Sequence, residues 1–460
     1  MTDNVKTPSF IQALILVVLL VSVFGFGIIG FKLSPVVPLL LSLVIMTAFA
    51  KINRTSWSQI QEQILAGIST ALGPLFLFLL IGMLIALWMA VNVIPTMLWL
   101  GFKIANVNWF LPTALIIAAM VGSMIGSAFT TLATVGVALM GVGTALGFNP
   151  ALVAGAILSG AIFGDKNSPL SESTSLAASI AEVDLFDHIK NLMWTTLPAL
   201  VSSLLIFTII GLGNHHGSVA DLEGLSNLLS PTWWAVLPLS LLVGMIWLKI
   251  PAIPTLLVNV AVSSVLFLTH NNLQNLSETL INGFKTPEQN ELLSNLLNRG
   301  GMMSMMPTVI IIMFALALGG LLTEQKIMQV VMEPVIKRIK TVSGLVMGTL
   351  LTGIGANFMI GEQFLATILP GQLWKTSFDK KGLSRLSLSR VIEDGGTVIN
   401  YLVPWGVAGS FAAQTLGVPV TNFAPFVFFS LLSPVFSLIS AWTGLGIKKN
   451  TVGNTQQIEK

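Results

Sequence analysis

Two clusters of polar and ionisable residues interrupt an otherwise apolar sequence, and they are where chemistry could take place. The first, residues 164–175, contains Asp165 and Lys166, and the second, residues 390–406, contains Asp394. Carboxylates, amides and hydroxyls supply the hard oxygen ligands that small cations such as Na⁺ favour. Gly and Pro in both clusters break helical hydrogen bonding and expose backbone groups. The two clusters therefore predict a cation site made from unwound segments.

The second cluster also predicts ion exchange. Glu393 and Asp394 are adjacent, and two like charges in a site of low dielectric constant oppose each other, which favours protonation of one of them. A carboxyl group that gains and loses a proton near physiological pH can exchange that proton for a metal cation. Competition of two ions for one site is the simplest physical basis for Na⁺/H⁺ exchange.

The candidate site residues are those whose oxygen atoms could hold the ion and those whose positive charge could replace it. We expect Na⁺ at Asp165 and Asp394. The candidate ion- or substrate-binding residues are Asp165, Asn167, Ser168, Glu172, Thr174, Glu393, Asp394, Thr397 and Asn400, and the candidate counter-charges are Lys166 and Arg390.

Structural roles for the same residues stay open at this point. Asp165 could cap a helix and pair with Lys166, and Glu393 could pair with Arg390 at helical spacing. Lys166 could equally extend to the membrane interface.

The composition determines the class of protein that must position these clusters. The chain has 460 residues, of which 54% are hydrophobic and 9% charged, with a mean hydropathy of +0.87. Soluble globular proteins carry roughly 25% charged residues, so this chain cannot cover itself with a water-compatible surface. It has no cysteine, which excludes disulfides, thiolate metal sites and catalytic thiols. The net charge is +3, and the Lys and Arg residues are scattered among loops. The sequence therefore has no basic patch that would indicate binding of nucleic acid.

Long apolar runs predict an all-α polytopic membrane protein with about 10–12 transmembrane helices, because a bilayer-spanning helix needs ~20 residues. The first run is predicted to be a retained span and not a signal peptide. Two stretches, 148–184 and 361–418, are interrupted by Gly, Pro and polar residues and predict broken or re-entrant helices. The apolar runs cover roughly 10–31, 33–50, 68–93, 109–126, 128–147, 189–212, 231–249, 251–269, 303–322, 342–360 and 422–446, and amphipathic segments at the interface are expected at 53–70, 286–299 and 324–341.

Positive charges predict the topology, because cytoplasmic loops are enriched in Lys and Arg. Lys51 and Arg54 follow the second span, and Lys448 and Lys449 follow the last, so both basic clusters are expected in the cytoplasm. The loop 213–230 contains no Lys or Arg and is expected outside. The predicted organisation is a first membrane repeat at 1–212, an extracytoplasmic loop at 213–230, a second, inverted repeat at 231–450 and a cytoplasmic tail at 451–460.

A duplication is indicated by matched residues in the two halves. Asp165 and Asp394 are separated by the same number of residues as Gly126 and Gly355. Inverted repeats whose discontinuous helices meet near the middle of the membrane are a recurrent plan of transporters.

At the two clusters the sequence resembles the NhaC family of sodium/proton antiporters, within the ion-transporter superfamily. Residues 164–171 are similar to the family pattern Gly-Asp-Lys-x-Ser-Pro-Leu-Ser, and residues 390–405 to the pattern Arg-x-x-Glu-Asp-x-x-Thr…Pro-Trp. The sequence differs where the family often has Ser-Asp-Thr-Thr, since Glu172 stands at the acidic position, and where Gly406 follows Pro-Trp. The resemblance implies two inverted repeats whose broken helices together form the ion site.

The resemblance implies a Na⁺/H⁺ antiporter of the bacterial cytoplasmic membrane that exports Na⁺ in exchange for H⁺. The alternative is a Na⁺/H⁺-coupled exchanger of small carboxylates such as malate and lactate, which would need an anion contact from Lys166 or a helix N-terminus. A non-transporting membrane protein, such as an embedded hydrolase or a scaffold, is less compatible with the Lys, amide and hydroxyl groups of the clusters. We expect no enzyme activity and no cofactor. The expected partners are Na⁺, H⁺, the lipid bilayer and, under the alternative, small carboxylates; nucleic acid is not expected, and a homodimer stays open.

Overall fold

The structure is a computed structural model that describes residues 8–104, 106–213, 229, 231–248, 250–286 and 298–449. Within these ranges the backbone forms helices and no strand, and one isolated antiparallel bridge joins Leu383 to Lys449. The prediction of an all-α fold is confirmed.

The helices of the first half follow one another closely. They are α1 (Phe10–Phe24) with the π-helical turn η1 (Gly25–Gly30), α2 (Val36–Ile52), α3 (Trp57–Ser69), α4 (Leu72–Ala90), α5 (Val93–Ile104), η2 (Val107–Trp109), α6 (Phe110–Ile125), α7 (Ala128–Thr131), η3 (Leu132–Gly136), α8 (Val137–Ala145), α9 (Pro150–Lys166), α10 (Glu172–Ala181) and α11 (Leu185–Gly213).

The second half has a similar succession of long and short helices. They are η4 (Trp233–Ala235), α13 (Val236–Trp247), α14 (Ala252–Leu268), α15 (Leu273–Asn282), α17 (Met302–Glu324), α18 (Ile327–Arg338), α19 (Val342–Ile360), α20 (Gln363–Lys380), α21 (Arg385–Gly396), η5 (Asn400–Leu402), α22 (Val407–Leu416), α23 (Val420–Phe423), η6 (Ala424–Phe426) and α24 (Phe428–Thr443).

Each apolar run of the sequence contains a helix, so the prediction of a polytopic membrane protein is confirmed. Seven described helices are long and apolar enough to cross a membrane, and an eighth span results if the bent pair Val420–Phe426 and Phe428–Thr443 counts as one. This number is smaller than about 10–12 because α2, α13 and α14 are apolar but shorter. The predicted runs miss α5, and α20 is a continuous helix inside the stretch expected to be broken.

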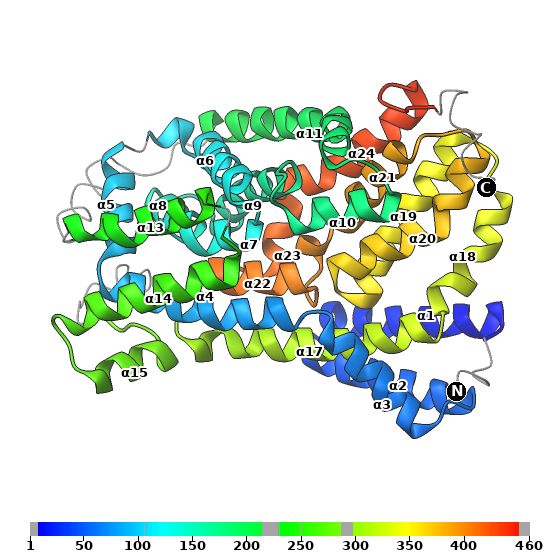
Figure 1. Cartoon of the computed structure of the whole chain (residues 1–460), viewed down its shortest axis with the longest axis horizontal. Helices are drawn as coiled ribbons and strands as arrows, with labels where there is room; N and C mark the ends of the chain where they lie inside the picture. Colours follow the sequence, from blue (N-terminus) through cyan, green and yellow to red (C-terminus); the bar gives the residue numbers. More distant parts are fainter. Residues whose placement is uncertain are drawn as a thin grey trace.

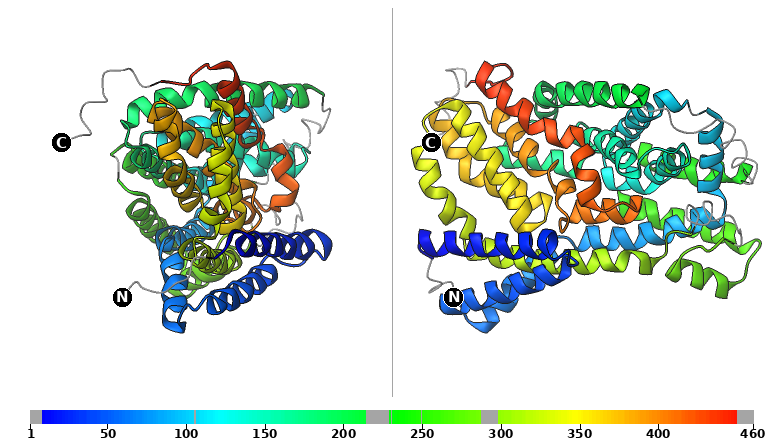
Figure 2. Two further views of the ribbon diagram at one scale, coloured as in Figure 1. Left: turned by 90° about the vertical axis from the view of Figure 1, so that its right-hand side faces the viewer. Right: turned by 180° about the vertical axis from the view of Figure 1, so that it is seen from behind.

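Three groups of buried apolar side chains hold the helices together. The largest joins α4, α6, α8, α9 and α22, the second joins α1, α2, α17 and α19, and the third joins α10 to α19, α20 and α21. In Figures 1 and 2, α2 and α3 lie at the edge of the molecule opposite α11 and α24. The third group packs α10 of the first half against helices of the second half.

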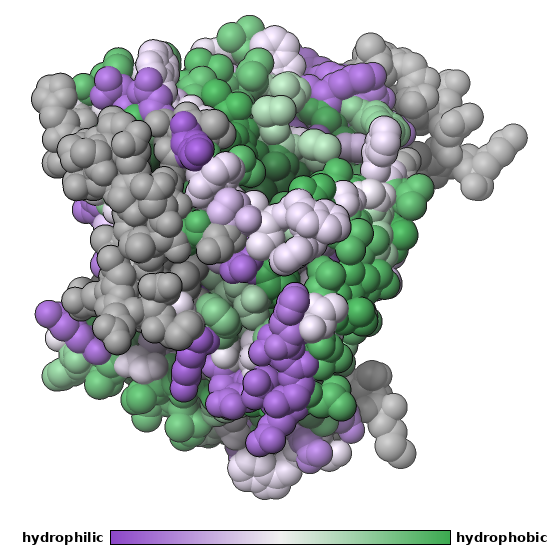
Figure 3. Space-filling model, turned by 90° about the vertical axis from the view of Figure 1, so that its left-hand side faces the viewer, coloured by the Kyte–Doolittle hydropathy of each residue, from purple (hydrophilic) through white to green (hydrophobic). Residues whose placement is uncertain are grey.

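The outer surface is compatible with lipid. Apolar side chains of α11 such as Leu205 and Ile209 are 58% and 70% exposed, although water would disfavour them there. In Figure 1, α4, α14 and α17 run along the long axis, and Figure 3 looks at one end of it. Hydrophilic side chains gather on this end between apolar areas, as expected of a face in contact with water.

Two of the three predicted amphipathic segments form helices. Residues 53–70 contain α3 and residues 324–341 contain α18. α3 packs closely against α17, since a Cβ atom at Gly67 would lie 2.2 Å from the carbonyl oxygen of Leu316. The remaining amphipathic segment, 286–299, lies mostly outside the described residues, since 287–297 are not described. The same holds for most of the loop 213–230 and for the tail 451–460.

Gly126 and Gly355, which the sequence analysis matched between the two halves, occupy different positions in their helices. Gly126 ends α6 in the left-handed conformation, with φ +70°, whereas Gly355 lies inside α19. The glycine that ends α19 is Gly361, with φ +74°. An L side chain in this conformation is strained, so both helix ends use glycine. The inverted relation of the halves stays a prediction.

Candidate ion-binding site

The first polar cluster forms the break between α9 and α10. Pro169 cannot continue α9, and the side chains of residues 167–171 bond to the backbone in place of helical partners. Asn167 donates to the carbonyl of Phe163 at 2.8 Å, Ser168 accepts from the amide of Leu170 at 3.2 Å, and Ser171 caps α10. The predicted unwound segment therefore exists, and it places Asp165 and Lys166 in the last turn of α9.

The second cluster forms the break after α21. Asn400 donates to Asn357 Oδ1 at 2.8 Å and accepts from the amide of Ala408 at 2.8 Å, so its amide fixes the start of α22. Thr397 donates to the carbonyl of Glu393 at 3.0 Å. Asn357, which the sequence analysis did not select, also donates to the carbonyl of Gly396 at 2.5 Å. In this structure Thr397 and Asn400 stabilise the break itself.

Lys166 and Asp394 form a buried ion pair between the two breaks. Their side chains are 1% and 0% exposed. Ser433 of α24 accepts from Lys166 Nζ at 3.1 Å and donates to Asp394 Oδ1 at 2.7 Å, and Thr195 of α11 donates to the same oxygen at 3.2 Å. Burial of either charge alone would be costly; here the two opposite charges compensate each other, and the hydroxyl groups supply hydrogen bonds in place of water.

Glu393 lies in a second buried network. Its Oε2 is 2.7 Å from Nε2 of His188, and its Oε1 accepts from Thr174 at 3.0 Å. His188 Nδ1 is 2.8 Å from Ser389 Oγ, and Ser389 Oγ also donates to the carbonyl of Leu386 at 3.0 Å. Both ring nitrogens of His188 therefore lie within hydrogen-bond distance of an oxygen atom, Ser389 Oγ at one nitrogen and Glu393 Oε2 at the other.

The structure decides between the open alternatives for the two basic residues. Lys166 does not pair with Asp165, because its ammonium group is bound to Asp394. Arg390 does not pair with Glu393: it donates to the carbonyl of Gly446 at 3.1 Å and to Ser440 at 2.7 Å. Arg390 therefore holds the segment after α24 and forms no ion pair with Glu393 or Asp394.

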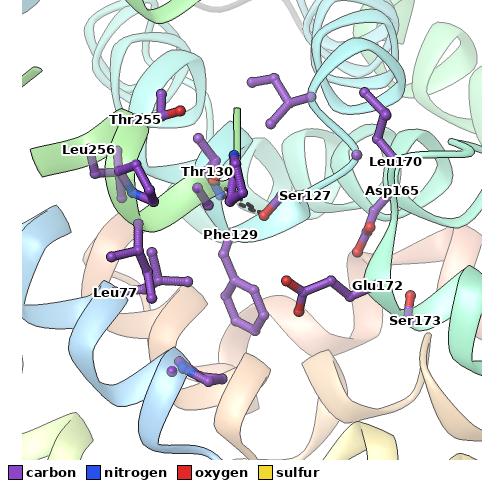
Figure 4. A pocket seen from close by; sticks show the side chains of 18 of the residues that line it. Leu77, Ser127, Phe129, Thr130, Asp165, Leu170, Glu172, Ser173, Thr255 and Leu256 are labelled. Carbon is purple, nitrogen blue, oxygen red and sulfur yellow. Dashed lines mark hydrogen bonds between the residues drawn. The ribbon is translucent and has the colours of Figure 1, made fainter. Parts of the chain in front are cut away.

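Asp165 faces a cavity of about 660 Å³. The hydroxyl of Ser171 and the backbone amide of Ala128 lie beside its carboxylate. Glu172 lines the same cavity, and Figure 4 shows both carboxylates and the hydroxyl of Ser127 pointing into one space beside the ring of Phe129. The wall is built from the start of α4, the end of α6, α7, the first break, the starts of α10 and α14, and the start of α20.

Asp165 and Asp394 are thus placed differently. Asp165 lines the cavity, whereas Asp394 is not among the described lining residues and is held by Lys166. No group of three or more His, Asp or Glu residues in the described part of the chain is arranged to hold a metal ion. Hydroxyl and carbonyl oxygens would have to complete the shell of a transported Na⁺.

Several residues of the site were missed by the sequence analysis. His188, Thr195 and Ser433 bind the cluster carboxylates from α11 and α24, and nothing in their local sequence sets them apart. Glu362, 2% exposed, caps α20 by accepting from the amide of Leu365 at 2.7 Å. The sequence signal that could have identified Glu362 is an acidic residue between two apolar stretches.

Comparison with known proteins agrees with this arrangement. The Na⁺/H⁺ antiporter family matches residues 160–445, which contain both breaks. The Na⁺/H⁺ antiporter NhaC of Alkalihalophilus pseudofirmus is 36% identical over 91% of this chain and 92% of its own length. NhaC of Bacillus subtilis is 38% identical over 88% of this chain and 92% of its own length.

A further relative is named for a different exchange. The malate-2H⁺/Na⁺-lactate antiporter of Bacillus subtilis is 32% identical over 86% of this chain and 87% of its own length. The family match extends over more than half of the chain, and the NhaC relatives cover nearly all of it. The chain therefore belongs to the Na⁺/H⁺ antiporter family.

Proposed function

We propose that the protein exports Na⁺ from the cell in exchange for H⁺ and that Asp165 is the carboxylate for which the two ions compete. The observation that supports this most strongly is the position of Asp165 at the end of a broken helix, on the wall of a cavity. Two NhaC relatives named as Na⁺/H⁺ antiporters support the same activity.

The exchange at Asp165 follows from simple charge balance. The ionised carboxylate attracts Na⁺, and a proton bound to the same group removes the charge and releases the cation. The hydroxyls of Ser127 and Ser171 and the carboxylate of Glu172 are the nearby oxygen atoms that could share the coordination. One ion at a time at Asp165 gives antiport provided that the site opens alternately to the two sides.

We propose that the ion pair of Lys166 and Asp394 rearranges when Na⁺ binds. Asp394 Oδ2 has no hydrogen-bond partner in the described protein, while Oδ1 is bound by Lys166, Ser433 and Thr195. A cation arriving at Asp394 would displace the ammonium group of Lys166, which would then need another carboxylate. We propose that this replacement couples ion binding to movement of the first break.

The structure gives less support to the organic-acid exchanger. Lys166 is bound to Asp394, and the described residues that line the cavity include two carboxylates and no basic side chain. A dicarboxylate in this cavity would meet like charge without a counter-ion. The relative named as a malate and lactate antiporter keeps this activity as the second candidate.

The test uses liposomes that contain the purified protein and a pH-sensitive dye. External Na⁺ should make the lumen alkaline as protons leave in exchange, without any organic acid. Asp165→Asn should lose this response, since an amide cannot bind a proton, and Asp187→Asn, which changes an exposed acid paired with Lys190, should keep it.

Two results would contradict the proposal. A response that requires malate or lactate would favour the organic-acid exchanger. A full Na⁺ response in Asp165→Asn would remove Asp165 from the exchange.

A further inference from the structure

The cavity beside Asp165 is larger than a bare Na⁺ ion requires. Its volume of about 660 Å³ lies within the ~300–1,000 Å³ that is typical of sites for small organic molecules. A Na⁺ ion needs only one shell of oxygen atoms around Asp165. The remaining space therefore calls for an explanation of its own.

The wall of the cavity has the chemistry of a site for a cation with an apolar body. Asp165 and Glu172 supply two carboxyl groups on one side. Leu77 and Leu256 lie on the other side, and the ring of Phe129 lies between the two sides. Among the described lining residues none is basic. Opposite charge, aliphatic surface and an aromatic ring are the groups that recognise ammonium and guanidinium ions.

A polar group without a partner gives an independent indication. Gln363, at the start of α20, is 5% exposed and lines the cavity, and its side-chain amide makes no hydrogen bond within the described protein. The amide is not among the fully enclosed polar groups that lack a partner, so it is open to the cavity and its bonding capacity is unused there. A polar ligand in the cavity would satisfy it.

We propose that this cavity binds a small organic cation, whose ammonium or guanidinium head lies between Asp165 and Glu172 and whose aliphatic body lies against Leu77 and Leu256. The inference rests on the proposed function, because the cation occupies the carboxylate at which Na⁺ and H⁺ compete. It assigns a substrate class to the cavity that Na⁺/H⁺ exchange alone does not require. The carbonyl oxygen of the Gln363 amide accepts a further hydrogen bond from the ligand.

The experiment measures ligand binding to the purified full-length protein by its thermal unfolding temperature and by calorimetry. Putrescine and agmatine are the cationic probes, 1,4-butanediol is the uncharged match of putrescine, and malate is the anionic probe, all at one ionic strength. We expect the two cations to raise the unfolding temperature and the diol and malate to have no effect.

A matched pair of variants locates the binding site. Glu172→Gln should weaken the binding of putrescine at least about tenfold, since a hydrogen bond to a charged group contributes about that factor. Glu333→Gln, which changes an exposed acid of α18 paired with Lys337, should bind putrescine as the wild type does. Equal unfolding temperatures of the ligand-free variants and wild type show that each is folded.

The outcomes separate this inference from the proposed function. Absence of putrescine and agmatine binding in protein that still exchanges Na⁺ for H⁺ overturns the inference alone. Equal binding of 1,4-butanediol, or cation binding unchanged by Glu172→Gln, overturns it as well. Malate binding that raises the unfolding temperature would show that the cavity takes anions, and it would overturn the inference as well.

Discussion

At the scale of single residues, the buried charges are arranged in pairs that come from different helices. Lys166 of α9 binds Asp394 of α21, and His188 of α11 binds Glu393 of the same helix. Thr174 connects the pairs, because its hydroxyl lies 3.0 Å both from Glu393 Oε1 and from the carbonyl of Lys166. One hydroxyl therefore contacts a residue of each pair.

The ion pair can be tested by removing one or both partners. Lys166→Met leaves the charge of Asp394 buried without a cation and should lower the free energy of unfolding by about 3–5 kcal/mol. The double variant with Asp394→Leu should recover most of this loss, since apolar replacements of buried pairs are often neutral. Denaturant unfolding in detergent measures the difference.

An exposed ion pair is the control for this cycle. Lys337→Met breaks a pair with Glu333 whose side chains are 71% and 63% exposed, and it should change the stability by about 0–1 kcal/mol. Equal destabilisation in the single variant Lys166→Met and the double variant would show that the pair is not the source of the effect.

At the scale of helices, close packing of α6 on α9 determines where Asp165 lies. A Cβ atom at Gly160 would be 2.1 Å from the carbonyl oxygen of Leu115, and one at Gly164 would be 2.5 Å from the amide nitrogen of Ser123. Small residues allow helix backbones in membranes to approach each other this closely. The glycines of α9 thus hold its last turn, with Asp165, against the helix that ends at the cavity wall.

A larger residue at this contact should move α9 and weaken ion exchange. Gly160→Val forces the two backbones apart and should lower the stability by about 1–3 kcal/mol, as overpacking does. It should also reduce Na⁺-driven proton release in liposomes, because Asp165 moves with the helix.

The control changes a helical glycine that has free space around it. Gly244→Ala in α13 places a methyl group where, among the described residues, no atom beyond its chain neighbours and its own helix backbone lies within 4 Å. It should leave both unfolding and ion exchange as in the wild type. Wild-type exchange in Gly160→Val would mean that the helix contact does not position Asp165.

At the scale of the whole molecule, α10 of the first half packs against α20 and α21 of the second half. Glu182, which follows α10, binds Lys375 of α20 at 2.6 Å and also binds Arg385 of α21. Arg385 in turn contacts Asp379 at 3.3 Å. Together with the third apolar group, these ion pairs join the two halves at the polar surface.

The contacts at Glu182 should make stability depend on pH. Lys375, first, and Arg385 hold the pKa of Glu182 below its ordinary value of 4.5. Because this pKa is lowered by folding, the stabilisation is present above pH 4.5 and disappears as the pH falls through the lowered pKa. Glu182→Gln should lower the unfolding temperature at pH 7, and the two curves should converge in acid.

The control for the pH dependence is Glu333→Gln, because Glu333 binds Lys337 within one helix and does not connect the two halves of the protein. Its unfolding temperature should follow that of the wild type at each pH. A pH-independent difference between wild type and Glu182→Gln would contradict an electrostatic role of the Glu182 contacts.

The sequence by itself determined the class of protein, most helices and the positions of both breaks. Hydropathy and helix breaking are local properties, so residues such as Pro169 indicate where a span stops without knowledge of its neighbours. The cost of ionisable groups in an apolar setting likewise selects Asp165, Lys166 and Asp394 as residues that must bind something.

Only the tertiary structure decided which charges meet. From the sequence Lys166 could pair with Asp165 beside it, and Arg390 with Glu393 one turn away, yet their partners are Asp394 and the carbonyl of Gly446. His188 had no local signal at all. Electrostatic pairing depends on distances of a few ångströms between helices, and helix packing, not chain order, sets those distances.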